Sequence, residues 1–154
     1  MFWANEEKAA FEAFVTWAHD RWKQDAHMHI YHYAAYEKTA LRRLMGKYGT
    51  RESEVDDLLR NEVFVDLFTL IRQAIKIGEP KYSIKNIEHL YMEKRAGDVA
   101  TAMDSVVFYQ RWLNEQDGTH WQTSKILGNI RAYNKEDCDS TYMLAEWLRR
   151  LQSD

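Results

Sequence analysis

Residues that interrupt regular backbone are scarce in this chain, and this scarcity limits the folds open to it. Its 154 residues include one proline and six glycines. A sandwich or barrel of short strands needs frequent turns, which are usually built from Gly, Pro, Asn and Asp. The sequence therefore predicts long helices with at most a small sheet. Its length predicts a single domain over residues 1–154.

Apolar side chains recur at three- and four-residue intervals along most of the chain, which is the period of an amphipathic helix. On this basis we expect helices at residues 6–23, 37–48, 53–59, 83–91, 104–113 and 122–151. The last helix could be interrupted near Tyr133. The clearest turn is at residues 78–80, because Pro80 disfavours helical backbone in the residue before it.

Two short segments have the composition of strands. Residues 28–33 are β-branched and aromatic and predict a buried strand. Residues 63–67 are a second candidate, in competition with a helix because the apolar stretch 68–75 follows directly. The predicted fold class is thus α/β, mostly helical with a small sheet. A strand ending at Tyr33 would place Glu37 just beyond its carboxyl end, where sites of open α/β sheets cluster.

The last predicted helix carries an acid on its apolar face. The side chains of this face are Ile130, Tyr133, Asp137, Thr141, Leu144, Leu148 and Leu151. A carboxylate on a buried face is costly unless it is paired, hydrogen-bonded or bound to a metal, so Asp137 requires a partner. Alternatively, Asn134 could cap a new helix, with Asp137 as its capping-box partner. Spacing alone does not decide between the two.

Four segments in order carry a resemblance to a known family: residues 32–37, 64–67, 83–87 and 133–141. The last reads Tyr-Asn-Lys-Glu-Asp-Cys-Asp-Ser-Thr. Together they resemble the DEDD exonucleases, of DEDDy type, in the RNase H-like superfamily, and most closely the predicted RecB-type nucleases. The resemblance implies an RNase H-like fold and a 3′-5′ exonuclease-like hydrolase of DNA or RNA that uses Mg²⁺ or Mn²⁺.

The resemblance also implies roles for individual residues. Asp137 would be a metal ligand, and Tyr133 would orient the attacking water. Glu37 would be a second metal ligand, at a position where the family usually has Asp after an aromatic residue. Asp66 resembles an acid near the family site that is not usually a ligand, so we assign it no catalytic role.

The family's first motif, an Asp-x-Glu on a central strand, has no counterpart before Glu37. Its absence predicts an N-terminally truncated domain that lacks the first strands, leaving a small residual sheet and an isolated chain without activity. Residues 2–4 and 28–33 would then be strand edges with unpaired backbone N–H and C=O groups, and such edges readily pair with another chain. We therefore expect a homo-oligomer, or pairing with the missing N-terminal segment.

Basic residues around the turn at 78–80 form a candidate nucleic-acid surface, made of Lys76, Lys81, Lys85, Lys94 and Arg95. Lys76, Lys81 and Lys85 are the expected phosphate contacts, and Arg42 on the helix 37–48 could add to them. An ordinary solvated face explains the same run without a ligand.

Histidines at positions 27, 29 and 32 are close in sequence but would alternate across a strand, so no zinc site is expected there.

Net charge, cysteine count and the length of apolar segments restrict the cellular location and the function that the sequence predicts. The net charge of −3 gives no global attraction to nucleic acid, so binding would depend on local basic clusters. A single cysteine excludes an internal disulfide, and no segment approaches the ~20 apolar residues needed to span a bilayer. These features predict a cytoplasmic protein with no membrane partner. Two alternatives stay open: a non-catalytic nucleic-acid-binding or regulatory remnant of the fold, and a helical interaction protein with an accidental motif.

Overall fold

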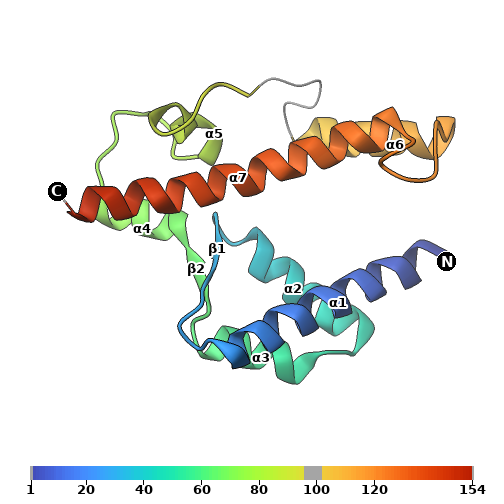
Figure 1. Cartoon of the computed structure of the whole chain (residues 1–154), viewed down its shortest axis with the longest axis horizontal. Coiled ribbons are helices and arrows are strands. Elements are labelled where there is room, and N and C mark those ends of the chain that lie inside the picture. The colour runs from blue at the N-terminus through green and yellow to red at the C-terminus, as the bar shows by residue number, and fades with distance from the viewer. Residues whose placement is uncertain (1, 96–101, 154) are drawn as a thin grey trace. The chain divides into compact units, whose positions relative to one another are not determined.

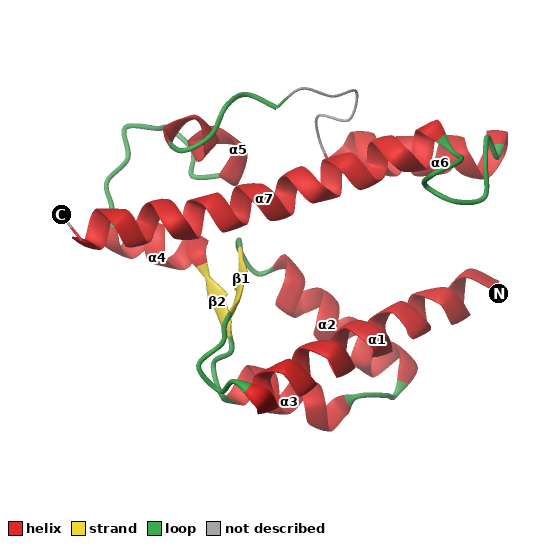
Figure 2. Cartoon of the chain, viewed as in Figure 1, coloured by secondary structure: helices red, strands yellow, loops and turns green. Residues whose placement is uncertain are grey.

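The structure of the protein is a computed structural model that describes residues 2–95 and 102–153. The chain divides into two compact units, Met1–Gly78 and Glu79–Asp154, and each is described by itself. Helices dominate both units, and the described strands lie in the first unit (Figure 2). The predicted mostly helical α/β chain with a small sheet is therefore confirmed, whereas the single-domain prediction stays a prediction.

The first unit contains four helices and two strands within its described residues (Figure 1). They are α1 (Phe2–Gln24), β1 (Ile30–His32), α2 (Tyr36–Tyr48), α3 (Glu52–Arg60), β2 (Phe64–Asp66) and α4 (Leu67–Ala74). Periodicity located α1, α2 and α3, since apolar side chains on one face must be buried against a neighbour. In the apolar stretch where strand and helix competed, β2 is followed directly by α4. The core is formed by Phe11, Val15, Ala18, Leu41, Val55, Leu58, Val63 and Phe64.

The sheet consists of β1 and β2, which pair in parallel with Ile30 opposite Phe64 and His32 opposite Asp66. Parallel strands need a long crossover connection, and α2 and α3 provide it. Each strand has three residues, so the predicted strand at 28–33 was too long. Residues 2–4 belong to α1, so the predicted strand edge there was wrong. Self-association stays a prediction.

The second unit contains α5 (Ile84–Ile87), the 3₁₀-helix η1 (Glu88–Leu90), α6 (Ala102–Glu115) and α7 (Lys125–Ser153). Before α7, the Ser124 hydroxyl accepts a hydrogen bond from the Leu127 N–H at 3.0 Å. The helix then runs through Asn134 without interruption. The capping-box alternative for Asn134 and Asp137 is therefore wrong.

None of the helices in the described ranges combines the length and the apolar character that crossing a bilayer requires.

Candidate functional site

Tyr133 and Asp137 lie one turn apart on the same face of α7. Tyr133 is buried, whereas 43% of the Asp137 side chain is exposed. Ser140 and Leu144 continue the face toward the C-terminus and are both fully buried. An uninterrupted helix thus holds the predicted catalytic tyrosine and carboxylate at a fixed separation.

Asp137 was expected to have a partner because it lies on the apolar face of its helix, and Arg95 is that partner. Its Nη1 donates to Asp137 Oδ1 at 2.6 Å, and its Nε lies 3.1 Å from both carboxylate oxygens of Glu88. Only 11% of the Arg95 side chain is exposed. Burial by itself would lower the pKa of Arg95, but the hydrogen bonds to Glu88 and Asp137 outweigh it and raise the pKa. The guanidinium therefore stays charged.

A buried network holds Glu88 in place on the other side of Arg95. The Ser140 hydroxyl donates to Glu88 Oε1 at 2.8 Å, and Tyr91 Oη lies 3.0 Å from Ser140 Oγ. Because the single Ser140 hydrogen is directed to the carboxylate, Tyr91 is the donor to Ser140. The 3₁₀-helix η1 and the segment after it are thereby tied to α7 through polar contacts. Such a network is stabilising only when every member is satisfied.

Lys85 contacts the predicted catalytic tyrosine from α5. Its Nζ donates to Tyr133 Oη at 2.9 Å and lies 4.7 Å from the centre of the ring. The Arg95 guanidinium carbon lies 5.6 Å from the same centre. Tyr133 is therefore in contact with two cations, in the distance range of cation–π interactions.

Sequence reasoning missed the roles of Glu88, Tyr91, Arg95 and Ser140. Arg95 was assigned only to the basic run, and the structure gives it a structural role instead. One signal was present: Ser140 lies seven residues after Tyr133 and three after Asp137, on the same helical face. No local pattern marked Glu88 as buried.

Glu37 lies in the first unit, in the first turn of α2 just beyond β1. Its side chain is 48% exposed, and Oε2 lies 3.5 Å from His32 Nδ1. His32 is buried, and the shorter hydrogen bond from its Nδ1, at 2.7 Å, goes to the Ala34 carbonyl. That bond determines how the imidazole is oriented.

The loop that leads to Glu37 is clamped at Ala34, whose φ of 65° lies in the left-handed region that L-residues rarely adopt. His32 Nδ1 donates a hydrogen bond to the Ala34 carbonyl. The Ala34 N–H donates one to Asp66 Oδ1 at 2.9 Å. Asp66 also caps α4 by accepting from the Phe68 N–H at 3.0 Å. These contacts give Asp66 a structural role.

We expect Asp66→Ala to lower the free energy of unfolding by about 1–2 kcal/mol, the usual cost of losing an N-cap. Asp66→Asn keeps an acceptor oxygen and is the matched control, with a smaller loss. Urea denaturation followed by circular dichroism measures both. An alanine variant as stable as the wild type would contradict the capping role.

Tyr33 gives the first unit an alkaline pH dependence. Burial, with a smaller contribution from the charge of Asp66, raises the pKa of Tyr33 from 10 to about 12. The folded chain therefore holds this proton more tightly than the unfolded chain does. Its contribution to stability is complete below pH 10 and is lost as the pH rises toward 12. We expect wild type to lose more stability than Tyr33→Phe over this interval in urea denaturation, and parallel losses would contradict it.

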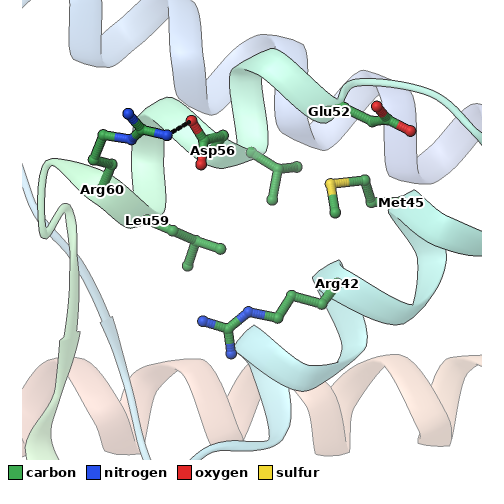
Figure 3. A pocket seen from close by; sticks show the side chains of 7 residues that line it. Arg42, Met45, Glu52, Asp56, Leu59 and Arg60 are labelled. Carbon is green, nitrogen blue, oxygen red and sulfur yellow. Dashed lines mark ion pairs between the residues drawn. The ribbon is translucent and has the colours of Figure 1, made fainter.

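The predicted nucleic-acid contacts are distributed over both units. Lys76 belongs to the first unit and Lys81 and Lys85 to the second, and all three are exposed residues. Arg42 borders a pocket of about 650 Å³ between α2 and α3 (Figure 3).

The pocket has an apolar floor and a rim of mixed charge. It is lined by Arg42, Met45, Glu52, Val55, Asp56, Leu59 and Arg60. Asp56 is paired with Arg60 at 2.8 Å. Two arginines and two acids leave no excess positive charge around Arg42, so the lining of this pocket does not favour phosphate binding.

The arrangement of donor side chains bears on metal binding by the described residues. Within the described ranges, no group of three or more His, Cys, Asp or Glu side chains converges. Oδ1 of Asp137 is already engaged by Arg95. His27 and His29 are exposed whereas His32 is buried. These residues therefore do not fit a two-metal centre on their own.

The sequence model of the RNase H superfamily matches residues 1–149. The chain belongs to the RNase H superfamily. No curated protein and no solved structure matched it. Membership confirms the predicted superfamily. Members of the RNase H superfamily generally use divalent metal ions, and membership indicates nuclease-type activity on nucleic acid. The DEDDy and RecB-type assignments stay predictions.

Proposed function

We propose that the chain is a DEDDy-type nuclease domain that hydrolyses phosphodiester bonds of DNA or RNA from the 3′ end, with Mg²⁺ or Mn²⁺ as cofactor. Tyr133, Asp137 and Glu37 are its site residues. The observation that carries the proposal is the shared face of α7: Tyr133 and Asp137 lie on successive turns of an unbroken helix in a member of the RNase H superfamily.

The second oxygen of the Asp137 carboxylate supports this role. Among the described residues only Oδ1 of the carboxylate has a partner, so Oδ2 is left to accept an ion or another donor. Carboxylate oxygens are the ligands that hard divalent cations prefer. Since Asp137 and Glu37 supply only two carboxylates, a two-metal site would need further ligands.

A second candidate is a non-catalytic nucleic-acid-binding or regulatory form of the same fold. The ion pair between Arg95 and Asp137 favours it, because a carboxylate neutralised by an arginine is a poorer metal ligand. The lack of three converging ligands within the described ranges favours it as well. In this form, Lys76 and Lys81 would bind the phosphate backbone without cleavage.

One assay separates the two candidates. Single-stranded DNA and RNA labelled at the 5′ end are incubated with the protein and Mn²⁺, Mg²⁺ or EDTA, and binding is followed in parallel. A nuclease gives products that shorten stepwise from the 3′ end with a metal and none with EDTA. Binding without shortening would support the second candidate, and neither binding nor cleavage would overturn both.

A further inference from the structure

We propose that Lys85 is a positioning residue for Tyr133 and fixes the direction in which the tyrosine hydroxyl donates its hydrogen. The inference rests on the proposed function, in which Tyr133 orients the attacking water. It gives Lys85 a task different from the phosphate contact that its place in the basic run predicts.

The direction follows from the chemistry of the two groups. An ammonium carries three donor hydrogens and no acceptor, so in the 2.9 Å contact Nζ must donate and Tyr133 Oη must accept. The hydrogen of the phenol is therefore left for a different acceptor. In the proposed site that acceptor is the oxygen of the attacking water or of the phosphate. Lys85 itself makes and breaks no bond.

The side chain of Tyr133 has little room to adopt another orientation. Its exposed fraction is 6%, and it lies in the face of α7 that is tied to η1. Lys85 Nζ lies 4.7 Å from the ring centre, and the Arg95 guanidinium lies 5.6 Å from it. Rotation of the ring would disturb both contacts.

The local charge argues against Lys85 as a simple phosphate contact. Lys85 and Arg95 contribute two positive charges, and Glu88 and Asp137 contribute two negative ones. These four charges sum to zero, so Lys85 adds less to the long-range attraction of a phosphate than an isolated surface lysine does. Lys81 is exposed in the preceding loop and is the better candidate for that contact.

Steady-state kinetics distinguish positioning from binding. Lys85→Met removes the charge and keeps the length, and we expect kcat to fall about ten-fold or more, with KM and the salt dependence of binding unchanged. Lys81→Met is the matched control, expected to raise KM and reduce the salt slope by about one. In a Tyr133→Phe background, Lys85→Met should have no further effect on kcat. A raised KM with unchanged kcat in Lys85→Met would overturn the inference.

A spectroscopic test does not depend on activity. The ultraviolet Raman difference between wild type and Tyr133→Phe isolates the tyrosine doublet, whose intensity ratio reports whether the phenol oxygen accepts a hydrogen bond. We expect Lys85→Met to shift that ratio away from the accepting state, and Lys85→Arg to preserve most of it. An unchanged ratio in Lys85→Met overturns the inference. A shifted ratio in a chain without nuclease activity would uphold the contact while refuting the proposed function.

Discussion

Arg95→Met is expected to lower the free energy of unfolding by about 3 kcal/mol, the cost of removing one partner from a buried ion pair. Methionine matches the length of the arginine stem but leaves the carboxylate of Glu88 without its bidentate partner. Glu88 is 8% exposed, so water cannot replace the guanidinium fully. Chemical denaturation at neutral pH measures the loss.

Two further variants show whether burial is the cause. Arg111→Met removes an exposed pair with Glu115 on α6 and should leave the unfolding midpoint close to that of wild type. Glu88→Gln added to Arg95→Met removes the stranded charge and should recover part of the stability. A single variant Arg95→Met as stable as Arg111→Met would contradict a structural role for the ion pair.

Asp137→Asn should reduce nuclease activity by on the order of 10²-fold or more, if the proposed function holds, while the fold is retained. Asparagine has the same shape and can still accept from Arg95 through its amide oxygen. Arg95 keeps its contacts with Glu88 in either case. The loss would therefore come from the missing negative charge. Cleavage rates with Mn²⁺ and thermal unfolding of the same preparations test this.

Asp139→Asn is the matched control for Asp137. Asp139 is on the same helix and is 50% exposed, close to the 43% of Asp137, but it pairs with Lys135 four residues earlier on α7. We expect it to retain wild-type cleavage. Equal losses in the two variants, or full activity in Asp137→Asn, would remove Asp137 from the site.

Local periodicity was enough to predict most of the helices and the shared face of Tyr133 and Asp137. It failed where tertiary contacts outweigh local preference. Asn134 favours caps and turns, yet it lies inside α7 because the buried residues on both sides of it, Tyr133 and Ser140, keep one face of the helix packed. The strands were predicted too long, because aromatic and β-branched composition does not reveal how many residues pair.

The partners of the site were beyond sequence reasoning for a different reason. Arg95 and Asp137 are 42 residues apart, and Glu88 and Ser140 are 52 residues apart. Such contacts follow from how η1 packs on α7, and no local pattern records that packing. A basic run also looks the same whether its members face solvent or, as with Arg95, are buried against carboxylates.

The continuity of α7 restricts how this chain can change in length over evolution. Each residue of an α-helix turns the following side chains by about 100°. One residue inserted between Tyr133 and Asp137 would therefore rotate Asp137, together with Ser140, off the face that carries Tyr133. Arg95 could then no longer contact both the Tyr133 ring and the Asp137 carboxylate. Substitutions at the exposed positions 134 and 135 preserve that register. Among related chains, this four-residue interval should vary in composition but not in length.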